Sequence, residues 1–209
     1  MESHYSQIPS PLLVEHLSRF KISPSAKNYG APIRTGWDTA CEGKALDIAT
    51  GYGRNALYLA EQGYRVEGVD RDESAVAFCN AEAARRALPF TATCTDLEKE
   101  VSFSKEAYDL VACFYYLDRE IMPQMKGAVR EGGVVVYETF LIDQHRQLGK
   151  PSRAEFCWGH NEILRHFLDF RVLFYFEGRL PREKGGAAEG DRWVAQLIAE
   201  RPATGLREA

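Results

Sequence analysis

Four residues in the first third of the chain have the types and the spacing of a nucleotide-binding site. Asp47 lies four residues before Gly51, Gly53 follows, and Asp70 comes 17 residues after Gly53. Glycines let a backbone turn sharply and approach a ligand closely. A carboxylate such as that of Asp70 can accept hydrogen bonds from two ribose hydroxyls. These residue types therefore predict a site for a ligand that contains a ribose.

The sequence around these residues predicts the elements that hold them. Residues 45–49 are a short apolar run, typical of a buried parallel strand, and residues 65–69 predict a second strand. A helical pattern lies between the two segments and stops at Gly63. The order is strand, glycine turn, helix, strand and acid, which is that of a βαβ nucleotide-binding unit. The N-terminus of the helix offers unpaired N–H groups to a ligand.

Asp47 favours one kind of ligand over another. A glycine pair alone also occurs in tight turns that bind nothing. A carboxylate at the end of the first strand would repel a pyrophosphate, whereas it suits a positive charge such as the ammonium of a methionine moiety. Asp47, Gly51, Gly53 and Asp70 stand at the spacings of motifs I and II of class I S-adenosylmethionine-dependent methyltransferases, which this stretch closely resembles.

The rest of the chain predicts an alternation of helices and strands. Helices are expected over 11–20, 72–87, 118–129 and 161–167, and further strands over 90–95, 107–114, 134–140, 170–177 and 192–200. The resemblance, which covers residues 28–201, implies an α/β fold. It is a Rossmann-like, seven-stranded, mostly parallel sheet with helices on both faces and a C-terminal antiparallel hairpin strand.

We expect two parts, an N-terminal helix and loop over residues 1–40 and a single class I methyltransferase domain over residues 41–209. Two interpretations of the first helix stay open, one in which it packs on the sheet edge and one in which it is a lid over the cofactor. The loop over 23–38 is either functional or a solvated connection.

The resemblance implies S-adenosyl-L-methionine as the cofactor and a set of residues that bind it. These are Asp47, Ala49, Gly51, Gly53, Arg54, Asp70, Arg71, Asp96, Leu97, Cys113 and Phe114. On the residues alone, Asp96 is a candidate helix cap, and the family implies a contact to the adenine instead.

Three residues on the acceptor side are catalytic candidates: Tyr116, Glu138 and Arg146. Tyr116 follows a predicted strand at the end where ligands bind in open α/β sheets, and Glu138 is a candidate base. Residues 141–158 are polar and predict a substrate-side loop. A further resemblance, to tellurite-resistance and thiopurine-type methyltransferases, implies that Arg146 in this loop contacts the acceptor. A general base is optional when the nucleophile is a thiolate or a reduced chalcogen.

Composition excludes several other classes of protein. The chain has 209 residues and a net charge of −4, which is not the charge of a nucleic-acid-binding surface. It has no apolar run near 18 residues and no signal-peptide pattern, so we expect no membrane span. Five cysteines without a C-x-x-C pair indicate reduced thiols in a cytoplasmic protein, and no cluster has zinc spacing. The oligomeric state stays open.

We therefore expect an S-adenosylmethionine-dependent methyltransferase that transfers a methyl group to a small-molecule acceptor by in-line displacement. The acceptor classes considered are a thiol, a chalcogen oxyanion or a similar small molecule. Two alternatives are an NAD-dependent oxidoreductase and a catalytically silent protein that binds S-adenosylmethionine. Asp47 and the lack of residues for a second domain disfavour the oxidoreductase.

Overall fold

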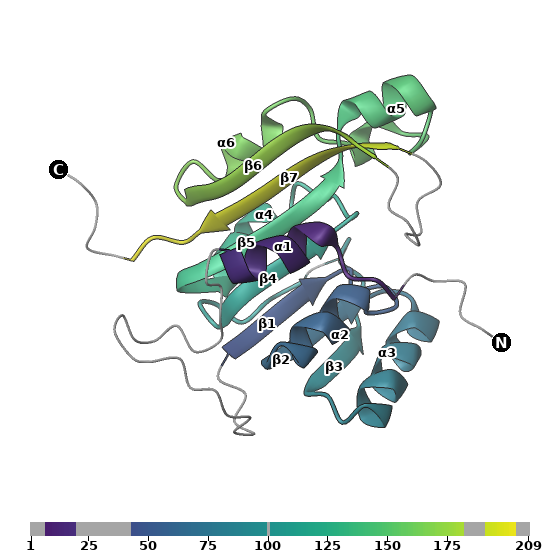
Figure 1. Ribbon diagram of the computed structural model, residues 1–209, viewed down its shortest axis with the longest axis vertical. Coiled ribbons are helices and arrows are strands. Elements are labelled where there is room, and N and C mark those ends of the chain that lie inside the picture. Colours follow the sequence, from purple (N-terminus) through teal and green to yellow (C-terminus); the bar gives the residue numbers. More distant parts are fainter. Residues whose placement is uncertain (1–6, 20–42, 100, 182–190, 204–209) are drawn as a thin grey trace.

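The computed structural model describes residues 7–19, 43–99, 101–181 and 191–203. They form a seven-stranded sheet in the order β3-β2-β1-β4-β5-β7-β6 (Figure 1). The strands are β1 Gly43–Ile48, β2 Tyr64–Asp70, β3 Phe90–Cys94, β4 Tyr108–Phe114, β5 Val129–Phe140, β6 Arg171–Leu180 and β7 Arg192–Glu200. Strands β1 to β5 are parallel, and β7 is antiparallel to both β5 and β6. The predicted sheet, with its antiparallel C-terminal hairpin, is confirmed.

Helices cover both faces of this sheet. They are α1 Pro11–Arg19, α2 Arg54–Glu61, α3 Glu73–Arg85, α4 Met122–Ala128, α5 Ile142–Leu148 and α6 Glu162–His166, with a short 3-10 helix η1 at Ala154–Phe156. Helices α1, α2 and α3 lie on one face and α4 and α6 on the other (Figure 1). None of the helices in the described ranges is long and apolar enough to cross a membrane.

The central strands are apolar on both sides because both faces of the sheet are buried. In β4, Leu110 and Ala112 pack into the cluster under α1, α2 and α3. The alternate residues Val111 and Cys113 pack into the cluster under α4 and α6. This alternation decides on which face each side chain of the site lies.

Helix α1 is fixed to the domain by its apolar side. Leu12, Leu13 and Leu17 are buried in the cluster that also contains α2. The backbone N–H of Ser10 donates to Oδ1 of Asn55 at 2.8 Å, which joins the start of α1 to α2. This contact matches the packed interpretation of the helix. The loop predicted over 23–38 lies outside the described residues. The interpretation of the first helix as a lid over the cofactor stays a prediction.

Strand β5 begins at Val129, five residues earlier than predicted, and two other regions also differ from their predictions. The helix expected from residue 118 begins at Met122, because the Asp118 carboxylate accepts the backbone N–H of Glu120 at 2.9 Å and forms a turn instead. The expected loop over 141–158 contains α5 and η1. Gln144 holds α5 against the sheet, since its side-chain oxygen accepts the backbone N–H of Trp193 at 2.7 Å.

The glycine turn provides a test of this packing. Gly51 and Gly53 both have left-handed backbones, with φ of +53° and +76°. A Cβ at Gly53 would lie 2.8 Å from Sγ of Cys79, whereas a Cβ at Gly51 would meet nothing within 4 Å. We expect Gly51→Ala to lower the free energy of unfolding by about 1–2 kcal/mol through backbone strain. Gly53→Ala should lose about 1–3 kcal/mol more through overpacking.

The measurement is urea unfolding of both variants without cofactor. Since the two variants share the strain, their difference isolates the contacts of the new Cβ with Cys79 and with Phe90, whose Cε1 would lie 3.3 Å away. Equal losses would show that α3 moves away from the turn at no cost.

Candidate active site

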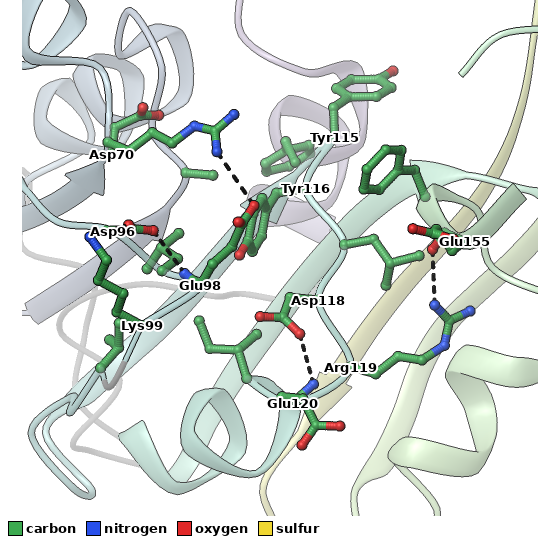
Figure 2. Close-up of a pocket in the computed structure, with 18 of the residues that line it drawn as sticks. Asp70, Asp96, Glu98, Lys99, Tyr115, Tyr116, Asp118, Arg119, Glu120 and Glu155 are labelled. Carbon is green, nitrogen blue, oxygen red and sulfur yellow. Dashed lines mark hydrogen bonds and ion pairs between the residues drawn. The ribbon is translucent and has the colours of Figure 1, made fainter. Parts of the chain in front are cut away.

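A cavity of about 930 Å³ opens beyond the carboxyl ends of the parallel strands. Asp70 ends β2, Asp96 follows β3, Phe114 ends β4 and Phe140 ends β5, and all four line the cavity. Figure 2 shows Asp70 and Asp96 on one side, Tyr115 and Tyr116 in the middle, and Asp118, Arg119, Glu120 and Glu155 on the other side. The topology therefore gathers at one sheet edge side chains that are far apart in the sequence.

Asp70 joins the glycine turn to the second strand. One of its carboxylate oxygens accepts the backbone N–H of Gly51 at 2.7 Å, and the other accepts the N–H of Asp72 at 3.0 Å. A carboxylate has about four lone-pair sites, so both oxygens can still accept further hydrogen bonds. The Asp70 side chain thus orders the turn and remains able to bind hydroxyl groups in the cavity.

Asp47 lies beneath the turn and is only 2% exposed. It is on the α2 side of β1, and it does not line the cavity. Its carboxylate accepts the Thr50 hydroxyl at 2.7 Å. Burial raises the pKa of Asp47 to about 7, although the Thr50 hydrogen bond and the charge of Arg54 act in the opposite direction. Asp47 is therefore a buried acid that supports the turn from below.

The cofactor-binding candidates, taken together, divide into two groups. Ala49, Asp70, Arg71, Asp96, Leu97 and Phe114 line the cavity. Asp47, Gly51, Gly53, Arg54 and Cys113 do not belong to its lining; they lie behind the wall, in or next to the same turn and strand ends. Asp96 also forms a turn, as its carboxylate accepts the N–H of Glu98 at 3.1 Å and pairs with Lys99 at 2.9 Å.

Tyr116 lies in the cavity wall and has an unusual hydroxyl group. The hydroxyl oxygen is covered, and it has no hydrogen-bond partner among the described residues. Burial and then the negative charge of Asp118 raise the pKa of Tyr116 above its ordinary value, so the hydroxyl keeps its proton. Tyr116 therefore places a neutral, covered hydroxyl group in the cavity wall.

The structure encloses Glu138 away from the cavity. Its side chain lies on the α1 side of β5 and is 1% exposed. Glu138 accepts the hydroxyl of Tyr115 and also Nε2 of Gln196 at 2.6 Å, and Arg192 lies 4.0 Å away. Because these neighbours surround the carboxylate, its position does not support the role of a base. The alternation along β5 is the reason, since neighbouring residues point to opposite faces.

Arg146 lies on the surface of α5. Its side chain is exposed, and it is not part of the cavity lining. The helical conformation of residues 142–148 explains the difference from the predicted loop, because a helix holds one side against the sheet and turns the other outward. The role of Arg146 toward the acceptor stays a prediction that its position does not favour.

Sequence analysis missed Arg119, the basic residue with the most contacts in the cavity wall. Its guanidinium donates to both Glu162 oxygens, at 2.6 and 3.0 Å, and to the backbone carbonyls of Glu155 and Cys157 at 3.0 and 3.2 Å. It also lies 5.0 Å from the ring centre of Trp158. These contacts fix the chain after β4 against η1 and α6. The available signal was the position of Arg119, three residues after the aromatic pair at the strand end.

The described ranges contain no group of three or more His, Cys, Asp or Glu residues that could hold a metal ion. Where the structure describes the cysteines, Cys79, Cys94, Cys113 and Cys157 are free thiols. The described residues that line the cavity bring carboxylates, cations, aromatic rings, two tyrosines and the amide of Gln124.

The raised pKa of Asp47 predicts how stability depends on pH. The folded pKa of about 7 exceeds the ordinary value of 3.8, so the folded chain binds more protons between these pH values. The stabilising contribution is present below pH 4 and is lost as pH rises through 7. Asparagine is neutral at every pH and can still accept from Thr50. At pH 8 we expect Asp47→Asn to raise the free energy of unfolding by up to about 4 kcal/mol.

Thermal unfolding of the cofactor-free protein at pH 4.5 and pH 8 measures this effect. The control is Glu73→Gln, which removes an exposed carboxylate from α3. A gain for Asp47→Asn that is equal at both pH values, or that is matched by the control, would contradict the buried-acid assignment.

Comparison with known proteins gives the family. Residues 45–133 match the methyltransferase domain family. The chain is 30% identical to hemagglutinin 1 of Eikenella corrodens over 152 residues, which are 69% of this chain and 49% of that protein. It is 29% identical over 142 residues to the Haemophilus influenzae protein named probable S-adenosyl-L-methionine-dependent methyltransferase TehB, covering 64% of this chain and 48% of that one. It thus spans about half the length of these relatives.

A solved structure gives the same relationship. The crystal structure of TehB from Haemophilus influenzae matches with a TM-score of 0.63 and 25% identity, over 76% of this chain and 57% of that chain. The strand order and the glycine turn that Asp70 holds agree with this match. Residues 45–133 therefore match a methyltransferase domain, and the chain is related to TehB and resembles the class I S-adenosylmethionine-dependent methyltransferases, whose cofactor is S-adenosyl-L-methionine.

Proposed function

We propose that this protein transfers a methyl group from S-adenosylmethionine to a small-molecule acceptor bound in the same cavity. The observation that carries the proposal is the Asp70 carboxylate, which holds the glycine turn at the cavity edge and keeps lone pairs for a ribose. The proposal extends the family relationship, which gives the cofactor, to an activity of the whole protein.

The residues of the glycine turn and of the β2 and β3 ends fit the cofactor. A Cβ at Gly51 would meet nothing within 4 Å, so the turn leaves open space beside Asp70. Ala49 has a left-handed backbone with φ of +56°, which brings the chain close to the cavity. Asp96 and Leu97 provide a carboxylate and an apolar contact where the family binds adenine. The Asp70 carboxylate would bind the ribose hydroxyls.

The chemistry of the reaction is mostly that of the cofactor. When bound, it supplies a methyl group on a positively charged sulfur, which leaves as a neutral thioether. The residues of the chain position the acceptor and exclude water, and such positioning can lower a barrier by about 7–11 kcal/mol. This is consistent with the enclosed position of Glu138, since a reactive nucleophile needs no base from the protein.

The size of the cavity supports a second ligand. Small-molecule sites usually enclose roughly 300–1,000 Å³, and this cavity, at about 930 Å³, is near the upper limit. The β2 and β3 ends contribute Asp70 and Asp96, while the β4 and β5 ends contribute Tyr116 and Phe140. We assign the first half to the cofactor and call the second, with the chain after β4 and η1, the acceptor half.

Cofactor binding is tested at Asp70. Asp70→Ala removes the acceptor of the ribose hydroxyls and of the Gly51 N–H, and should weaken S-adenosylhomocysteine binding by about 1–3 kcal/mol. The control is Asp72→Ala, which removes the cap of α3 but no lining residue. It should cost about 1 kcal/mol of stability and leave the Kd unchanged. Calorimetry gives both constants, and equal Kd values for Asp70→Ala and the parent would refute the assignment.

Acceptor binding is tested at Tyr116. Tyr116→Phe removes only the hydroxyl that has no partner among the described residues. We expect a lower kcat/KM for the acceptor and a cofactor Kd within about 1 kcal/mol of the parent, because the turn that holds Asp70 is unchanged. Release of S-adenosylhomocysteine measures turnover. If cofactor affinity falls instead, Tyr116 belongs to the cofactor half.

A further inference from the structure

We infer that the acceptor of this protein is a neutral or positively charged molecule with a flat apolar body, and that the cavity rejects anionic acceptors. The inference rests on the proposed function and specifies its substrate class. It removes chalcogen oxyanions from the acceptors considered on sequence grounds, and it assigns Asp118 and Glu120 as residues that determine specificity.

The first observation is the balance of charge in the cavity lining. Six carboxylates face the cavity, from Asp70, Asp96, Glu98, Asp118, Glu120 and Glu155. Three cationic side chains accompany them, from Arg71, Lys99 and Arg119. Arg153, outside the lining, pairs with Glu155 and reduces the excess of negative charge. The remaining excess attracts cations and repels anions, and salt screens it because several of these side chains are largely exposed.

The second observation is that each of the three cations has a carboxylate partner. Lys99 pairs with Asp96 at 2.9 Å, and Arg71 lies 3.4 Å from Glu98. Arg119 has the firmest partner, since both Glu162 oxygens accept from its guanidinium. An anion in the cavity would have to compete with these carboxylates. A carboxylate or oxyanion that leaves water without a cation of its own loses much of its hydration free energy.

The third observation concerns the acceptor half. Asp118 accepts the backbone N–H of Glu120 at 2.9 Å, and neither side chain forms an ion pair with a described cation. Figure 2 shows Asp118 next to Tyr116 and Glu120 beyond Asp118, both on the far side from Asp70, and the Glu120 side chain is exposed. Two carboxylates in this position are suited to a protonated amine or another positive group on the acceptor.

The fourth observation is the apolar part of the cavity lining. Tyr116, Leu117, Ile121, Phe140 and Phe156 line this part of the cavity. The Phe156 side chain is 42% exposed, so one of its surfaces is available to a ligand. Aromatic faces bind flat apolar groups and also cations. The same wall would contact an anion unfavourably, because the face of an aromatic ring is electron-rich.

The experiment uses three thiophenols that share a nucleophile and a ring and differ only in the charge of the para group. They are 4-(aminomethyl)thiophenol, 4-methylthiophenol and 4-mercaptobenzoate. Because the thiol of each compound is largely ionised at neutral pH, the names cationic and anionic refer to the para group alone. Their binding to the full chain loaded with S-adenosylhomocysteine is measured by calorimetry, and their turnover by S-adenosylhomocysteine release from S-adenosylmethionine. We expect the cationic compound to bind at least about tenfold more tightly than the anionic one at low salt. The difference should shrink as ionic strength rises.

Variants locate the origin of the preference. Asp118→Asn and Glu120→Gln should each reduce the ratio between cationic and anionic compounds severalfold, because each removes one negative charge and little volume. Glu73→Gln removes an exposed carboxylate of α3 that does not line the cavity, and it should leave the ratio unchanged.

The two measurements separate the two proposals. Equal or tighter binding of 4-mercaptobenzoate would overturn the inference, and so would a ratio that Asp118→Asn and Glu120→Gln leave unchanged. A charge preference in binding without turnover of any of the three compounds would support the inference and count against the proposed methyl transfer.

Discussion

The Asp70 carboxylate is the interaction on which the site depends. One of its oxygens holds the Gly51 N–H and the other holds the Asp72 N–H, so one side chain fixes the glycine turn and the start of α3 together. The turn could not take its left-handed conformation at Gly51 and Gly53 at low cost with other residues. Strands β1 and β2 are parallel neighbours, so Asp70, the last residue of β2, lies next to the turn that follows β1. Fold and cofactor site thus share one set of hydrogen bonds.

Sequence alone predicted this part of the molecule because its signals are local. Apolar runs, a glycine turn and a terminal acid all lie within residues 45–70, and the periodicity of each element is visible in the chain. The family resemblance predicted a mostly parallel, seven-stranded sheet with a C-terminal antiparallel hairpin strand, and the antiparallel β7 confirmed it. The start of α4 was predicted four residues too early, since Asp118 can form a turn as readily as it can cap a helix.

The acceptor half could not be predicted in the same way because its contacts are distant in sequence. Arg119 and Glu162 are 43 residues apart, and nothing near either residue announces the pair. Glu138 was chosen for its place at a strand end, but the face on which it lies depends on the register of β5 against β4 and β7. Arg146 lies on α5, and the sequence indicated a loop there because Gly149 and Pro151 lie nearby. The burial of these side chains, and the face of the sheet on which each lies, can be determined only from the neighbouring strands and helices of the folded chain.

The chain between β5 and α6 leaves the sheet and returns to it at almost the same point. The backbone N–H of Trp158 donates to the Phe140 carbonyl at 2.9 Å, and the N–H of Ile142 donates to the Trp158 carbonyl at 2.8 Å. The residues between these bonds form a closed excursion that contributes Pro151, Glu155 and Phe156 to the cavity. Such an excursion can change in length and composition while the sheet keeps its register. Under the proposed function, related chains would diverge in what they methylate by exchanging this one segment, and would inherit the cofactor half unaltered.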